Sequence, residues 1–251
     1  MKEELVLSTC LMAGRIMMEN GSEVYRVEDT MNRIAENAGI SNTVSYVTAT
    51  GLFMSIRNSS FSQLEEVHER SINLEKIVAV NHLSREFAAK KISLLQLNER
   101  LKRVNKDTPS FSLIWQTLAA GFVSCTLMYI FGGTWQDFVP TFLIGCLGFI
   151  AGIYIKKWLQ MRFLDMFVAA FVIGTLAIFS VRIGLANNVD HIIIGAVMPL
   201  VPGVAITNSF RDILSGDLLS GTARGIEALF VAAAIGVGIA TTLLLFGGGI
   251  A

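Results

Sequence analysis

The sequence predicts a multi-pass α-helical membrane protein with five spans, preceded by an N-terminal cytoplasmic α+β domain. Of its 251 residues, 53% are hydrophobic and only 16% are charged, and its mean hydropathy is +0.57. A soluble domain typically carries about 25% charged residues. Residues 1–108 hold 14 of the 20 Lys and Arg and 14 of the 20 Asp and Glu. We therefore expect a soluble domain over 1–108 and a transmembrane domain over 109–251.

The soluble half has a mixed helix and strand pattern. Apolar residues at three- and four-residue steps and residues suited to capping predict helices over 5–19, 23–38, 74–90 and 94–104. Segments rich in Val, Thr, Tyr and Phe, with a more charged third segment, predict strands over 43–50, 52–57 and 64–72.

The second half contains apolar segments of about the length that crosses a bilayer as a helix, roughly 20 residues. The expected spans are 111–131, 138–155, 165–181, 191–210 and 228–246. The fourth is interrupted at its middle by Pro199, Pro202 and Gly203. Each proline removes a backbone donor and crowds the preceding turn, and transporters often build a substrate site at such a break. We therefore expect the break to line a pathway.

Basic residues in short loops set the orientation of a membrane protein. The segment before the first span and the second and fourth loops hold eight basic residues, whereas the first and third loops hold only Arg182. The eight are Lys102, Arg103, Lys106, Lys156, Lys157, Arg162, Arg211 and Arg224. The N-terminus is therefore expected in the cytoplasm and the C-terminus outside, in the cell inner or plasma membrane.

Small residues recur every fourth position in several spans, which allows close helix packing in lipid. Gly148 and Gly152 form such a step in the second span, and Ala232, Gly236 and Ala240 continue one in the fifth. These positions are consistent with packing inside the chain or with a subunit interface. Because no internal repeat is visible, a second copy or a second subunit is expected.

Polar and charged residues are dense after the broken span. They are Thr207, Asn208, Arg211, Asp212, Asp217, Arg224 and Glu227. Such a set can bind a zwitterion or relay a proton, and it can equally be a solvated cytoplasmic loop. Gly216, Gly221 and Gly225 would permit a tight or re-entrant path here.

The sequence offers little support for an enzyme or for a bound cofactor. Glu23, Arg26 and Glu28 cluster on the second helix, where a solvated face with ion pairs is the simpler interpretation. Cys10, Cys125 and Cys146 form no metal-binding spacing, so neither a metal nor a cofactor is expected. The net charge is zero, which argues against a nucleic-acid partner.

Two groups of residues, far apart in the chain, resemble the threonine/serine exporter family. One group runs through Gly21, Ser22, Glu23, Val24, Tyr25, Arg26, Val27 and Glu28 to Met31 and Ile34. The other comprises Pro202, Gly203, Asn208, Asp212, Gly216, Asp217, Ser220, Gly221 and Arg224. The chain's size is similar to that of the larger subunit of the split type, in which a smaller membrane subunit of about four spans is encoded separately.

This resemblance implies export of threonine and serine, or of a dicarboxylate such as succinate, by proton-coupled secondary transport. It also implies a smaller membrane partner. In this interpretation the break lines the pathway, Arg211 meets a carboxylate, and Asp212, Asp217 or Glu227 meets an amine or carries a proton.

Two other interpretations remain open. One is a membrane-tethered hydrolase using Ser22, Glu23, Glu28 or His82 in the N-terminal domain. The other is a ligand-sensing subunit for which the spans are only an anchor.

Overall fold

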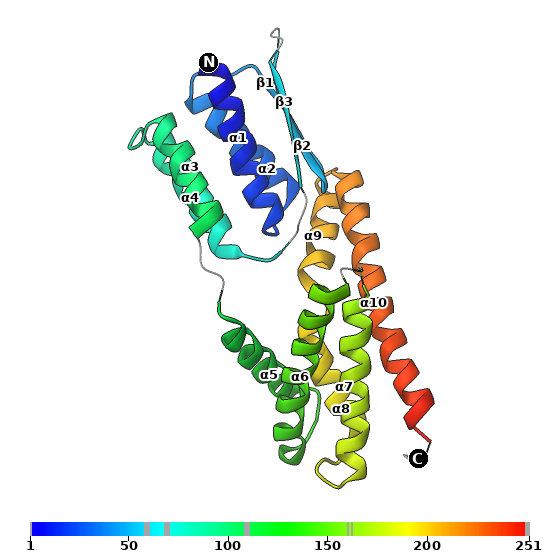
Figure 1. The fold of residues 1–251 in the computed structure, drawn as a ribbon. Helices are drawn as coiled ribbons and strands as arrows, with labels where there is room; N and C mark the ends of the chain where they lie inside the picture. Colours follow the sequence, from blue (N-terminus) through cyan, green and yellow to red (C-terminus); the bar gives the residue numbers. More distant parts are fainter. Residues whose placement is uncertain are drawn as a thin grey trace. The chain divides into compact units, whose positions relative to one another are not determined.

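The computed structural model describes residues 2–57, 61–67, 71–107, 111–159, 161 and 163–248. The protein is mostly helical, with one small sheet (Figure 1). It divides into two compact units, which do not follow the chain in a simple way. The first comprises residues 1–110 and 204–226, and the second comprises residues 111–203 and 227–251. The division at residue 108 into a cytoplasmic and a transmembrane domain stays a prediction.

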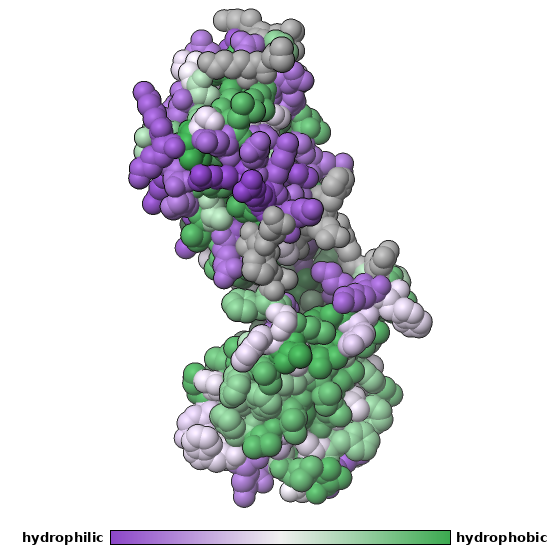
Figure 2. Space-filling view, turned by 60° about the vertical axis from the view of Figure 1, so that its left-hand side comes forward, coloured by the Kyte–Doolittle hydropathy of each residue, from purple (hydrophilic) through white to green (hydrophobic). Residues whose placement is uncertain are grey.

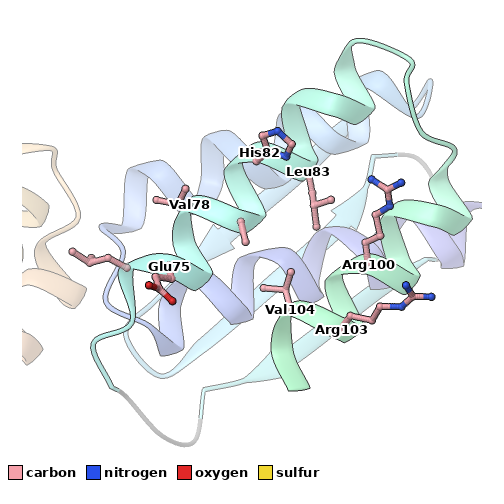
Figure 3. Close-up of a pocket in the computed structure, with 9 residues that line it drawn as sticks. Glu75, Val78, His82, Leu83, Arg100, Arg103 and Val104 are labelled. Carbon is pink, nitrogen blue, oxygen red and sulfur yellow. The ribbon is translucent and has the colours of Figure 1, made fainter. Parts of the chain in front are cut away.

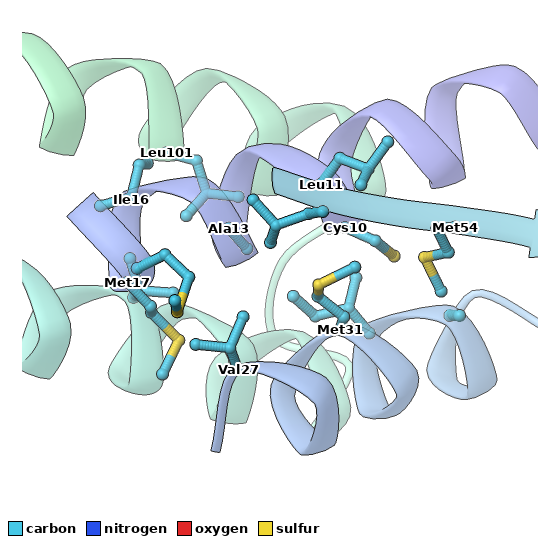
Figure 4. Packing of buried hydrophobic residues seen from close by; sticks show 14 of the residues in the cluster. Cys10, Leu11, Ala13, Ile16, Met17, Val27, Met31, Met54 and Leu101 are labelled. Atoms are coloured by element: carbon cyan, nitrogen blue, oxygen red, sulfur yellow. The ribbon is translucent and has the colours of Figure 1, made fainter. Parts of the chain in front are cut away.

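The first unit is built around its first helix. Helix α1 (Lys2–Glu19) contacts α2 (Val24–Asn37), the sheet, and the hairpin of α3 (Leu74–Ala88) and α4 (Leu94–Asp107). Its residues Leu7, Leu11 and Met17 are at most 1% exposed. Figure 4 shows side chains of α1 meeting Val27 and Met31 of α2, Met54 of the sheet and Leu101 of α4. Beyond its first turn, only one strip of this helix, through Ser8, Met12, Arg15 and Glu19, stays half-buried, and the other sides are covered.

The sheet is an antiparallel meander of β1 (Thr43–Val47), β2 (Gly51–Ile56) and β3 (Ser62–Glu66). Alternate residues of β2 are buried, including Leu52 and Met54, as expected for a strand with one face on a core. The expected third strand at 64–72 was placed too late. Pairing of Phe53 with Leu64 and of Gly51 with Glu66 fixes the observed register, and residues 68–70 lie outside the described part.

The second unit consists of packed apolar helices. These are α5 (Leu113–Ile130), α6 (Trp135–Leu159), α7 (Leu164–Arg182), α8 (Val189–Val197) with the 3-10 turn η1 (Met198–Leu200), and most of α10 (Leu218–Phe246). Four helices of the described chain are long and apolar enough to span a membrane. The number rises to five if Val189–Leu200 and Gly203–Leu214 together count as one broken span. In Figure 2 the part of the surface formed by these apolar helices is largely hydrophobic.

The predicted interruption of the fourth span is confirmed. Helix α8 ends in η1, and α9 (Gly203–Leu214) begins after Val201 and Pro202. The expected start of the fifth span at residue 228 is wrong, because α10 already begins at Leu218. Gly221 packs against the backbone of Ser209 and Ile213, so the small residues serve helix packing there.

Glycines of the membrane helices make close contacts within the chain. A Cβ on Gly148 of α6 would collide with the side chain of Ile173 on α7. Gly152 lies against Ala169 of the same helix, and Gly174 lies against Thr242 of α10. Packing inside the chain therefore accounts for the small residues of α6, whereas a Cβ on Gly236 of α10 would meet nothing within 4 Å.

These glycines give a matched test of the membrane packing. Gly148→Val should lower the stability of the detergent-solubilised protein by about 1–3 kcal/mol, because the new methyl groups overpack the α6–α7 contact. Gly236→Val adds the same atoms to open space and should leave stability nearly unchanged. Thermal unfolding of both variants measures the difference, and equal losses would contradict the described packing.

Candidate functional site

The turn between α1 and α2 presents backbone groups that need partners. Gly21 has a φ of +96°, which favours glycine. The amide of Ser22 donates to the carbonyl of Met17 at 3.0 Å and closes the turn. Glu23 is the N-cap of α2, yet its side chain makes no capping hydrogen bond. The carbonyls of Gly21 and Ser22 and the first amide of α2 are therefore available to another segment.

Helix α9 supplies the partners of this turn from nearly 190 residues away. Asn208 Nδ2 donates to the carbonyl of Gly21 at 2.9 Å. One turn further along the same face, Asp212 Oδ1 accepts a hydrogen bond from the amide of Val24 at 3.1 Å. Asp212 therefore caps α2 from a distant part of the chain. A carboxylate is well suited to this position, since helix N-termini are partially positive.

Arg224 of α10 completes the buried part of the site. Its Nη1 lies 3.2 Å from Asp212 Oδ2, and its Nη2 donates to the carbonyl of Ser22 at 2.9 Å. The side chains of Arg224 and Asp212 are only 7% and 0% exposed. A buried ion pair of this kind is costly to break, because each charge then lacks its compensation.

Glu23 makes the outer part of the site. Its carboxylate contacts Arg211 of α9 and lies 3.2 Å from Arg26 Nη1. Burial raises the pKa of Glu23, but a hydrogen bond from its own backbone amide, the hydrogen bond from Arg211 and the charges of Arg26 and Arg211 outweigh this and hold the pKa below its usual value. Glu23 is thus a carboxylate held by two arginines. We call Glu23, Asn208, Arg211, Asp212 and Arg224 the cap cluster.

Two further acids, Glu28 and Asp217, lie near the cap cluster. Their pKa values are raised, whereas that of Glu23 is lowered. Glu28 Oε1 accepts a hydrogen bond from the amide of Val47 at 3.1 Å. Burial and then the charge of Asp217 raise the pKa of Glu28, although the Val47 hydrogen bond opposes them. Burial also raises the pKa of Asp217. Both carboxyl groups therefore bind a proton more readily than an exposed acid.

The structure brings together most of the predicted site residues from the two distant parts of the sequence, but some of them lie elsewhere. Gly21, Glu23, Arg26, Asn208, Arg211, Asp212 and Arg224 meet, with Glu28 and Asp217 nearby. Pro199 lies in η1, and Pro202 and Gly203 lie where α9 begins. Thr207 is exposed on α9, and Glu227 belongs to the second unit.

Sequence reasoning missed Ser209, whose buried hydroxyl donates to the carbonyl of Gly221 at 2.7 Å and fastens α9 to α10. The one sequence feature that could have pointed to Ser209 is its position next to Asn208. It also missed the carbonyl of Ser22, because a backbone group leaves no trace in the sequence.

The residues proposed for a hydrolase are arranged differently. Ser22 is 1% exposed, and its hydroxyl has no hydrogen-bond partner in the described part of the chain. His82 is on α3 and lies 4.0 Å from Glu86. Within the described residues, no group of three or more His, Cys, Asp or Glu could hold a metal ion.

The buried ion pair predicts a large effect of a small change. Burial raises the pKa of Asp212, although the amide of Val24 and the charge of Arg224 oppose this. Because the guanidinium of Arg224 lies 3.2 Å from the carboxylate and is itself buried, the pair decides the outcome: Asp212→Asn should destabilise the protein by about 3–5 kcal/mol, since Arg224 stays buried without its counter-charge. Asp29→Asn breaks an exposed pair with Arg33 on α2 and should cost about 1 kcal/mol or less. Chemical denaturation in detergent compares the two variants, and similar losses would argue against the ion pair as the main stabilising contact.

The pKa values of Glu28 and Glu23 shift in opposite directions, so the two acids should change protein stability with pH in opposite ways. The folded pKa of Glu28 is raised, so its contribution to stability is present below the usual pKa of 4.5 and lost as the pH rises through the folded value. Glu28→Gln should therefore be more stable than the parent at pH 7 and equal to it at low pH. The folded pKa of Glu23 is lowered, so Glu23→Gln should be less stable at pH 7, with the difference vanishing as the pH falls.

Melting temperatures measured from pH 8 down to well below the usual pKa of 4.5 follow both series, because the effect of Glu23 is lost only as the pH falls through its lowered folded value. Effects of the same sign in the two variants would contradict the assigned environments.

Comparison with known proteins identifies the chain's relatives. Residues 8–246 match the family model described as "Putative threonine/serine exporter". The protein named "Probable succinate transporter subunit YjjP" of Escherichia coli (strain K12) is 22% identical, over 98% of this chain and 96% of that protein. The "Probable threonine/serine exporter" of Mycobacterium tuberculosis is 20% identical over 95% of this chain and 46% of its own length.

A fungal protein is also similar. The "Pheromone-regulated membrane protein 10" of Pichia sorbitophila is 22% identical over 94% of this chain and 24% of its own length. No solved structure matches the chain. Because the family match covers nearly all of the sequence, including both halves of the cap cluster, the chain belongs to the threonine/serine exporter family.

Proposed function

We propose that this chain is one subunit of an exporter of small metabolites in the cell inner or plasma membrane. Its substrate is threonine and serine, or a dicarboxylate such as succinate, and export is driven by the proton gradient. The observation that carries the proposal is α9, a single helix that begins at the break after Pro202 and ends at the cap cluster. It links the interrupted span directly to the residues that hold the soluble unit together.

The break supplies the pathway in this proposal. Helix interruptions within the membrane present backbone groups that can bind a solute. Pro199, Pro202 and Gly203 form the interruption, and Thr207 adds an exposed hydroxyl one turn into α9. A Cβ on Gly203 would meet nothing within 4 Å, so a solute can approach the backbone there.

Arg211 is the proposed contact for the substrate carboxylate. Its side chain is 57% exposed and its guanidinium pairs with Glu23, so a substrate carboxylate can take the place of Glu23 without first dismantling the buried pair. Threonine, serine and succinate all carry such a group. Arginine suits it, because its planar fork binds carboxylates through two hydrogen bonds.

An acidic side chain is needed to carry a proton or to bind a substrate amine, and the sequence offers Asp212, Asp217 and Glu227 for this role. Asp212 already has the amide of Val24 and Arg224 as partners. Asp217 has a raised pKa and lies in the short connection between α9 and α10. We therefore assign proton transfer to Asp217, with Glu28 as its neighbour and Glu227 as a further acid on α10.

A smaller membrane subunit is the proposed partner, and a second copy of this chain is the alternative. Ala232, Gly236 and Ala240 form an exposed stripe on α10, which suits close approach of another helix in lipid. The similar E. coli protein is itself named a subunit. In this arrangement the N-terminus is cytoplasmic and the C-terminus lies outside.

The transport proposal is tested by removing the break. Pro199→Ala with Pro202→Ala should abolish export at normal protein levels, because restored helical hydrogen bonds close the gap. The matched control is Pro140→Ala, which removes the proline inside α6 and should leave export within about twofold.

Export is measured in liposomes with labelled threonine, serine and succinate, under an imposed pH gradient, with and without the neighbouring small membrane protein. Unchanged transport in the double variant would overturn the pathway and favour the ligand-sensing anchor. Loss in both variants would show that the effect is not specific to the break.

A further inference from the structure

The α3–α4 hairpin of the first unit carries an apolar groove that the cap cluster does not use. Its volume is about 630 Å³, and it lies between the two helices (Figure 3). Leu74 and Val78 of α3 lie on one side, with Arg103 and Val104 of α4 on the other. Leu74 is 62% exposed and Val78 is 67% exposed. Large apolar side chains this exposed and this close together indicate a contact surface.

Two exposed apolar residues, Leu74 and Val78, lie toward one end of the hairpin, and Leu95 lies near the other end. Lys76 Nζ donates to the carbonyl of Asn105 at 3.0 Å, so the start of α3 lies beside the end of α4. Exposed Lys102, Arg103 and Lys106 occupy this same end. Apolar side chains therefore stand next to a concentration of positive charge.

This end is also the one tethered to the membrane helices. Helix α4 ends at Asp107 and α5, a candidate span, begins at Leu113. Six peptide steps reach at most about 20 Å. The other end of the hairpin is one helix length further away, about 20 Å for the 14 residues of α4. The tether therefore holds this end of the hairpin within about 20 Å of the first residue of α5.

We propose that the tethered end of the α3–α4 hairpin binds the surface of an anionic phospholipid bilayer. Lys102, Arg103 and Lys106 contact lipid phosphates, and Leu74 and Val78 enter the region between headgroups and acyl chains. Basic residues next to a span are attracted to an anionic lipid surface, and apolar side chains add to this attraction when they leave water. The inference depends on α5 being a span and not on the substrate transported.

The position of a fluorophore relative to the bilayer tests this contact. A bimane is attached at Leu74→Cys in the full-length protein carrying Cys146→Ala, in nanodiscs of phosphatidylcholine with 30% phosphatidylglycerol. Cys10 and Cys125 are fully buried, and burial raises the pKa of Cys10 to about 12, so neither thiol competes for the label. The matched control is Leu95→Cys, which is 64% exposed near the far end of the hairpin.

Brominated acyl chains should quench the label at position 74 at least twofold more than the label at position 95. Quenching at 74 should fall in pure phosphatidylcholine and in the variant Lys102→Glu, Arg103→Glu, Lys106→Glu. Equal quenching at both positions, or no dependence on lipid charge and on these three residues, would overturn the proposal. So would shielding of position 74 in lipid-free detergent that grows with protein concentration, because a second protein would then cover it.

Two separate readouts keep this inference apart from the proposed function: quenching tests lipid contact, and the liposome assay tests transport. The charge-reversed variant should lose lipid contact, and its result is read from quenching alone. Failure of the double-proline test would leave that readout untouched.

Discussion

The carboxylate of Asp212 is the contact on which the first unit depends. It terminates α2 by accepting the amide of Val24, and it neutralises Arg224, which in turn binds the carbonyl of Ser22. Three segments that are distant in sequence are held by one side chain that water does not reach. Because each partner is buried, the segments cannot separate one at a time without leaving a charge or an amide unsatisfied. The first unit therefore includes α9 and the start of α10 as integral parts.

The membrane unit is stabilised in a different way. Its helices approach closely where glycine replaces a side chain, as at Gly148 against Ile173. Much of their surface stays apolar and uncovered, which is typical of helices that pack against lipid or another membrane chain. The first unit is thus held by a buried ion pair and its hydrogen bonds, whereas the second is held by close apolar packing of its helices.

Periodicity and composition were sufficient to predict the helices, the apolar spans and the break at Pro202. They predicted three strands but placed β3 too late, because its register follows from pairing with β2. The start of the fifth span was placed too late for a related reason: Gly221 was taken to permit a tight path, yet it lies in α10 and packs against α9. Both halves of the cap cluster were singled out, but their meeting was not predictable. The contact between Val24 and Asp212 depends on the fold of the 187 residues between them.

The two helices that leave the cap cluster differ in continuity. Helix α10 runs without interruption from Leu218 to Phe246, a rod of about 44 Å, whereas the route through α9 meets a joint at Val201 and Pro202. The first unit is therefore joined to the second by one unbroken helix and, through α9, by a segment that is interrupted next to Pro202.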